Sequence, residues 1–134
     1  LTETSLVGDF SNIAEVMAQL RAIGIGVALD DFGTGYAGLD YLQALPFSCI
    51  KIDMSFVRQM ASSERSYHIV KSALTLANTL GMTTIAEGIE DAATATALRA
   101  MGCRLGQGYY LGKPMALDAL AEWAATTRRA RSAP

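Results

Sequence analysis

The sequence has 134 residues, of which 51% are hydrophobic and 18% are charged, and its formal net charge is -2. That length and balance suit one domain with a buried core, and they exclude a wholly disordered chain. No apolar run approaches the roughly 20 residues of a membrane helix, and the charge does not indicate a surface for duplex nucleic acid. The chain starts at Leu1 without a Met or a signal peptide, so we expect that it has been cut from a longer protein.

Strand and helix signals alternate along the chain. Residues 1–4 are expected to form the end of a strand, and Ser11 to cap a helix that Gly24 ends. A strand to Asp30 follows, and then a short helix that ends at Pro46. The remaining elements are expected to be a strand at 48–53, a helix at 63–80, a strand at 83–86, a helix capped by Asp91, a strand at 103–106 and a last helix introduced by Pro114 and Asp118.

Three minor features complete the chain. Cys49 and Cys103 both fall in predicted strands and lack CxxC spacing, so we expect buried thiols of a reducing compartment, which favours a cytoplasmic location. Residues 126–134 form a basic tail that we expect to be disordered. Tyr109 and Tyr110 could flank a base, although packing is the commoner role of such a pair.

Helices between strands force parallel crossovers, so the pattern predicts an α/β fold with a parallel sheet. All strands of such a sheet end at the same rim. Acidic residues recur at these strand ends: Glu3, then Asp30 and Asp31, then Asp53, then Glu87 with Glu90. We therefore expect them to converge at one opening.

Crowded carboxylates predict a hard divalent cation such as Mg²⁺, Mn²⁺ or Ca²⁺. Adjacent Asp30 and Asp31 could serve two metals about 3.5–4 Å apart, as in phosphoryl transfer. The glycines at 33 and 35 would let the chain turn so that both acids point to the same place. Lys51 would supply a positive charge beside them. The alternative is that Lys51 and Asp53 form only an ion pair within their strand.

In its motifs the sequence closely resembles the EAL domain, the cyclic di-GMP phosphodiesterase of bacterial signalling. The similar segments, in the same order and spacing as in the family, are Leu-Thr-Glu-Thr at 1–4, Asp-Asp-Phe-Gly-Thr-Gly-Tyr at 30–36, Lys-Ile-Asp at 51–53, Glu-Gly-Ile-Glu at 87–90 and Gln-Gly-Tyr at 107–109, followed by Lys113-Pro114. The resemblance covers residues 1 to about 125. It implies a (β/α)₈ TIM-type barrel, of which this chain would form the second half, from the end of strand four to helix eight.

The resemblance also implies roles for single residues. Glu3, Asp30, Asp31 and Glu87 would hold two Mg²⁺ or Mn²⁺ ions, and Ca²⁺ would inhibit. Lys51 would hold the attacking water, and Glu87 could instead act as general base. Glu90 would pin the loop that follows Asp31, and that loop would also form a homodimer contact. Gln107, Asp53 and Pro114 would lie around the substrate or the metal ligands.

The sequence departs from the family pattern because it lacks the Glu-Ala-Leu segment and a metal-binding Asn. In the family, both lie before the position that corresponds to Leu1 of this chain. We therefore expect the chain alone to be inactive, and we expect sensory or GGDEF domains upstream in a protein that could be anchored to a membrane. Two alternatives stay open. One is an EAL-type receptor that binds cyclic di-GMP without cutting it. The other is a different barrel enzyme with acidic strand ends, although it would not explain the Gln-Gly-Tyr and Lys-Pro segments.

Overall fold

The computed structural model describes residues 1–2, 10–34 and 39–131. Helices and strands alternate along these residues as expected from the sequence, except that an additional short helix, α3 (Met54–Gln59), precedes α4 (Glu64–Thr79). In chain order they are α1 (Phe10–Ala22), β1 (Ala28–Phe32), α2 (Leu39–Ala44), β2 (Cys49–Ile52), α3 (Met54–Gln59), α4 (Glu64–Thr79), β3 (Thr83–Ala86), α5 (Ala92–Ala100), β4 (Leu105–Gly106) and α6 (Leu117–Arg131).

The four strands form one parallel sheet in the order β1-β2-β3-β4. Thr2 forms a further parallel bridge to Asp30, and the Asp30 amide donates to the Leu1 carbonyl at 2.7 Å. The N-terminal residues thus lie beside β1, as expected for the end of a preceding strand. The C-terminal ends of all these segments lie at one edge of the sheet, which is what places the site.

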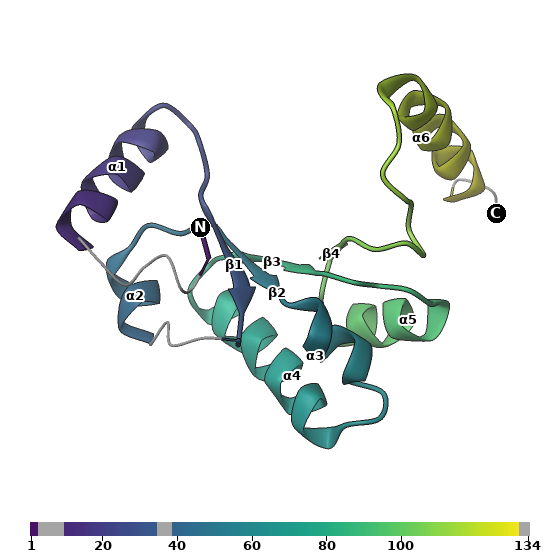
Figure 1. The fold of residues 1–134 in the computed structure, drawn as a ribbon, viewed down its shortest axis with the longest axis horizontal. Coiled ribbons are helices and arrows are strands. Elements are labelled where there is room, and N and C mark those ends of the chain that lie inside the picture. The colour runs from purple at the N-terminus through teal and green to yellow at the C-terminus, as the bar shows by residue number, and fades with distance from the viewer. Residues whose placement is uncertain (3–9, 35–38, 132–134) are drawn as a thin grey trace.

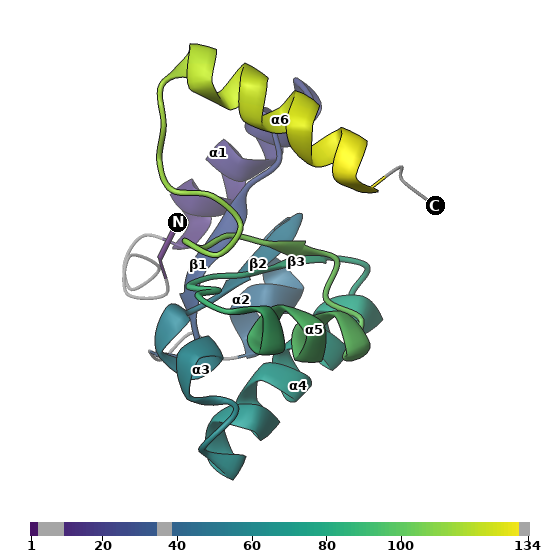
Figure 2. The same ribbon diagram turned by 90° about the vertical axis from the view of Figure 1, so that its right-hand side faces the viewer.

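Helices α3, α4 and α5 lie along one face of the sheet (Figures 1 and 2). Leu29, Ile50 and Ile52 point into this layer, where each is fully buried. Successive residues of a strand point to opposite faces. Asp30 and Lys51, which follow Leu29 and Ile50, therefore project from the other face, away from the apolar core.

Several helix boundaries follow the expected signals. Ser63 caps α4 and accepts a hydrogen bond from the Ser66 amide at 3.2 Å, and Asp91 caps α5 and accepts one from the Thr94 amide at 2.7 Å. Ser11, however, is not a cap, because α1 already begins at Phe10. Cys49 and Cys103 are both buried and free, although Cys103 precedes the two-residue strand β4 instead of lying in it.

Helix α6 stands apart from the sheet, at the end of an extended segment (Figure 1). It continues to Arg131, so residues 126–131 are helical where we expected a disordered tail; residues 132–134 lie outside the described part. Within the described residues, none of the helices combines the length and the apolar character that crossing a bilayer requires.

Candidate active site

Asp30 and Asp31 lie in an irregular part of β1. Leu29 pairs with Ile50 and Phe32 with Ile52, so three steps along β1 match two along β2. Such an extra residue is a β-bulge. Asp31 takes up the excess with a φ of 57°, a left-handed conformation that Asp tolerates better than most residues. The bulge breaks the alternation of the strand, so that both carboxylates can serve the same side of the sheet.

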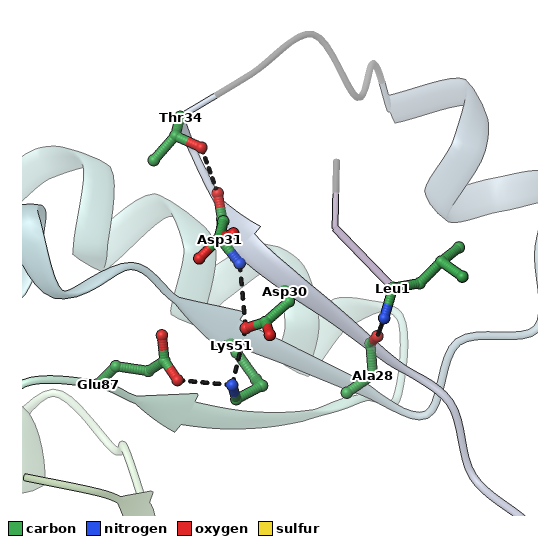
Figure 3. A network of polar contacts seen from close by, with 7 residues as sticks. All are labelled: Leu1, Ala28, Asp30, Asp31, Thr34, Lys51 and Glu87. Atoms are coloured by element: carbon green, nitrogen blue, oxygen red, sulfur yellow. Dashed lines mark hydrogen bonds and ion pairs between the residues drawn. The ribbon is translucent and has the colours of Figure 1, made fainter. Parts of the chain in front are cut away.

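This geometry corrects the expected strand end. We expected the strand to stop at Asp30 and the glycines beyond it to turn the second acid. Instead the strand runs to Phe32, and the turn is made at Asp31 itself. The Asp31 amide donates to Asp30 Oδ1 at 3.2 Å, and the Asp31 carbonyl accepts from Thr34 Oγ1 at 2.8 Å (Figure 3). These two contacts fix the conformation on each side of Asp31.

Lys51 lies between carboxylates from two other strand ends. Its Nζ is 2.7 Å from Asp30 Oδ1 and 2.6 Å from Glu87 Oε1 (Figure 3). Glu87 directly follows β3, and its amide donates to the Ile52 carbonyl at 3.1 Å. The ion pairs of Lys51 therefore join β1 to β3 across β2, in place of a pair with Asp53 within its own strand.

The surroundings keep both partners of the first ion pair charged. The hydrogen bond from Lys51 lowers the pKa of Asp30 against the opposing effect of burial. Burial acts to lower the pKa of Lys51, but hydrogen bonds to Asp30 and Glu87 outweigh it, so the pKa is raised. The raised pKa of Lys51 stabilises the folded state until the pH rises through it, and the lowered pKa of Asp30 does so until the pH falls through it. The ion pair therefore persists through neutral pH.

Asp30, Asp31 and Glu87 form a cluster suited to a metal ion. Each offers one carboxylate oxygen, and these oxygens lie within 4.8 Å of one another. Hard oxygen donors of this kind suit Mg²⁺ and Mn²⁺, so the residues present fit the cation that the sequence predicts. Glu3, the fourth predicted ligand, lies outside the described residues.

The other predicted site residues fall into two groups. Glu90, Gln107 and Pro114 line a cleft of about 690 Å³, which Glu87 shares with them. Asp53 is the N-cap of α3: its Oδ1 accepts from the amide of Ser55 at 2.9 Å and also from the Ser55 hydroxyl. This cap explains the position of Asp53 without a substrate, and its contact with substrate stays a prediction.

One residue of the cleft, Arg58, was not predicted. Arg58 of α3 lines it and contacts Glu90, with 2.5 Å between the guanidinium and Oε1; we had expected Glu90 to hold the loop after Asp31, whose residues 35–38 lie outside the described part. Tyr109, for which we considered both packing and a place beside a base, also lines the cleft and is 63% exposed. Lys113 Nζ lies 5.6 Å from the centre of its ring.

Gly108 allows the Gln-Gly-Tyr segment to lie directly on the residues that follow Glu87. A Cβ at this position would meet the Ile89 backbone oxygen at 2.1 Å and nitrogen at 2.3 Å. The Ile89 amide donates to the Gln107 carbonyl at 3.1 Å, and the Tyr110 amide donates to the Ile89 carbonyl at 3.1 Å. Glycine is therefore required here by close approach of two backbones.

We expect Gly108→Ala to lower the free energy of unfolding by about 1–3 kcal/mol, because backbone atoms cannot move aside as a flexible side chain can. Gly112→Ala in the same segment is the matched control, since its Cβ would meet only the ends of the Met115 and Trp123 side chains, at 3.5 and 3.6 Å. Chemical denaturation of both variants measures the difference. Equal stability of the two would contradict the close approach.

Comparison with known proteins identifies the family. The family model of the EAL domain matches residues 1–114. This chain belongs to the EAL domain family. The match covers the segments on which the resemblance was based, and it ends at Pro114, earlier than the boundary near residue 125 that we expected.

Relatives of the EAL chain include proteins that are named as phosphodiesterases. It is 42% identical over 122 residues to the cyclic di-GMP phosphodiesterase PA2567 of Pseudomonas aeruginosa, which covers 91% of the chain and 21% of that protein. Among solved structures, PaMucR phosphodiesterase in complex with c-di-GMP matches with a TM-score of 0.84 and 38% identity, over 90% of the chain and 49% of PaMucR. The chain therefore spans about a fifth of one relative and half of the other.

A third match concerns the metal. The manganese and cy-diGMP complex of BlrP1 from Klebsiella pneumoniae matches with a TM-score of 0.74 and 37% identity, over 81% of the chain and 28% of BlrP1. Together with the parallel sheet and its alternating helices, these structural matches confirm the expected fold, a partial (β/α) barrel of the EAL type.

Proposed function

We propose that this EAL chain supplies part of the active site of an enzyme that hydrolyses cyclic di-GMP to linear pGpG. One observation carries the proposal: carboxylates from two strand ends, Asp30 with Asp31 and Glu87, lie within 4.8 Å of one another beside the ammonium of Lys51. The names of the relatives support the same substrate.

Asp30, Asp31 and Glu87 would hold Mg²⁺ or Mn²⁺, with Glu3 as a further ligand. A bound divalent cation offsets negative charge on the phosphate and lowers the pKa of water. In the hydrolysis, a water oxygen bonds to phosphorus, the bond from phosphorus to the leaving sugar oxygen breaks, and that oxygen takes a proton. Lys51 would orient the attacking water, because its ammonium lies among the carboxylates and stays protonated at neutral pH.

The cleft beside Glu87 is suited to the rest of the substrate. Gln107 and Tyr109 offer an amide and an exposed aromatic ring, and Lys113 brings positive charge toward an anionic ligand. Aromatic side chains stack on nucleobases without regard to sequence. We infer that a guanine or its ribose phosphate occupies this cleft, while the scissile phosphate lies at the carboxylates.

Further parts of the proposal rest on the resemblance to the family. We infer a homodimer formed through the loop after Asp31, an upstream sensory or GGDEF domain and a cytoplasmic location. The two buried, free cysteines support a reducing compartment. Some of the residues that would form this dimer contact lie outside the described part of the chain.

The direct test incubates the complete protein with cyclic di-GMP and Mn²⁺ or Mg²⁺ and separates the products by chromatography. We expect pGpG to form with the wild-type protein and not with Asp30→Asn. This substitution removes one carboxylate while the size of the side chain stays nearly the same. Tight binding without cleavage would instead identify a receptor. If the wild-type protein neither binds nor cleaves cyclic di-GMP, the proposed substrate is wrong.

A further inference from the structure

We propose that Arg58 is a positioning residue: by holding Glu90, it fixes the turn that carries Glu87 into the carboxylate cluster. The contact joins the Arg58 guanidinium to Glu90 Oε1 at 2.5 Å. Glu90 follows Glu87 by three residues, so the ion pair acts on the far end of the turn, while Lys51 contacts its near end. The inference rests on the proposed function where it concerns turnover.

Arg58 is carried by a helix that is itself fixed. Asp53 caps the N-terminus of α3 and directly follows β2, the strand of Lys51. Val57, next to Arg58, is fully buried in the core with Ile52. Because α3 is anchored at its start and by its buried side, the backbone of Arg58 has little freedom. The Arg58 side chain therefore reaches Glu90 from a fixed position.

The turn lies in direct contact with α3. Gly88 has a φ of 67°, and a Cβ there would meet Met54 Cβ at 2.5 Å and Arg58 Nε at 3.5 Å. On its other side, the Ile89 amide donates to the Gln107 carbonyl at 3.1 Å. The backbone around Glu87 is therefore held between α3 and the segment after β4, and the contact of Arg58 with Glu90 adds a side-chain tie.

The ion pair is too exposed to matter much for stability. The two side chains are 42% and 48% exposed, and ion pairs as exposed as this one contribute little to the stability of the fold. Groups that hydrogen-bond directly to a metal ligand change metal affinity or activity by about 10- to 100-fold, and Arg58 acts one step further out, so we expect an effect at the lower end of that range. A positioning role therefore predicts a loss of turnover and metal affinity without a matching loss of the unfolding temperature.

We expect Arg58→Ala in the complete protein to lower kcat for cyclic di-GMP about tenfold and to weaken Mn²⁺ binding, measured by calorimetry, by a similar factor. Arg58→Lys, which keeps the charge, should recover part of both. Because Arg58 acts through Glu90, adding Arg58→Ala to Glu90→Ala should cost less than a further twofold. Amide exchange of residues 87–90 should become faster in Arg58→Ala.

Arg65→Ala is the matched control, since Arg65 is an exposed arginine of α4 away from the cleft. The proposal is overturned if Arg58→Ala stays within twofold of the wild type in kcat and in Mn²⁺ affinity, or if its effect adds fully to that of Glu90→Ala. A wild-type protein that does not cleave cyclic di-GMP defeats only the proposed function. In that case, unchanged amide exchange and Mn²⁺ affinity in Arg58→Ala would still overturn the positioning role.

Discussion

Replacing Lys51 with methionine is expected to lower kcat for cyclic di-GMP by about 100- to 1000-fold, the cost of removing a preorganised donor from an active site. The affinity for Mn²⁺ should increase or stay the same. Lys51 contacts Asp30 at 2.7 Å and Glu87 at 2.6 Å, so its ammonium competes with a cation for these carboxylates. Methionine keeps most of the length of the side chain and removes that charge.

Steady-state kinetics at saturating Mn²⁺ and calorimetric titration of Mn²⁺ separate the two effects. Lys71→Met is the control, because Lys71 is exposed on α4 outside the cluster. A variant at Lys51 that lost Mn²⁺ affinity tenfold would show that the lysine maintains the arrangement of the carboxylates. A variant that kept more than a tenth of the wild-type kcat would show that the ammonium does not act in the reaction.

The placement of these residues at one rim could be predicted from sequence because it depends on periodicity alone. Asp30 and Glu87 each follow an apolar segment of strand length, and parallel strands bring their C-terminal ends to one edge. The structure brings Asp30, Asp31 and Glu87 together accordingly. The roles of the individual residues in metal binding and hydrolysis stay predictions, because proximity does not separate a metal ligand from a general base.

The bulge at Asp31 could not be predicted, since it depends on the register of β1 against β2. Glycines two and four residues beyond Asp31 are a strong signal for a turn, and they led us to place the turn at the glycines instead of at Asp31. A non-glycine residue with a positive φ leaves no comparable mark in the sequence, although Asp is one of the residues that tolerate it.

Helix α3 was missed for a different reason. It has six residues, of which Val57 alone is buried, so it shows no helical repeat of apolar positions. Its one clear signal is Asp53, an acid that caps the helix, and we had assigned this acid to the substrate. Arg58 was missed along with the helix that carries it. Asp53 with Ser55 two residues later was the pattern that could have revealed both.

Asp31→Asn is expected to weaken Mn²⁺ binding by at least about 10- to 100-fold and to lower kcat to a similar extent. Asn tolerates the left-handed conformation at a φ of 57°, and it keeps the amide that donates to Asp30 Oδ1. The change therefore removes one negative charge from the cluster of three carboxylates while the bulge in β1 is retained. The unfolding temperature should stay close to that of the wild type.

Two further variants separate the effect of the charge from the effect of the backbone conformation. Asp118→Asn removes the same charge from an exposed position in the first turn of α6 and should leave Mn²⁺ affinity unchanged. Asp31→Ala should lose Mn²⁺ affinity like Asp31→Asn and should also lose about 1 kcal/mol of stability, because alanine adopts a left-handed conformation less readily. If Asp31→Asn bound Mn²⁺ as tightly as the wild type, Asp31 would serve the geometry of the strand end, and Asp30 and Glu87 would have to hold the cation without it.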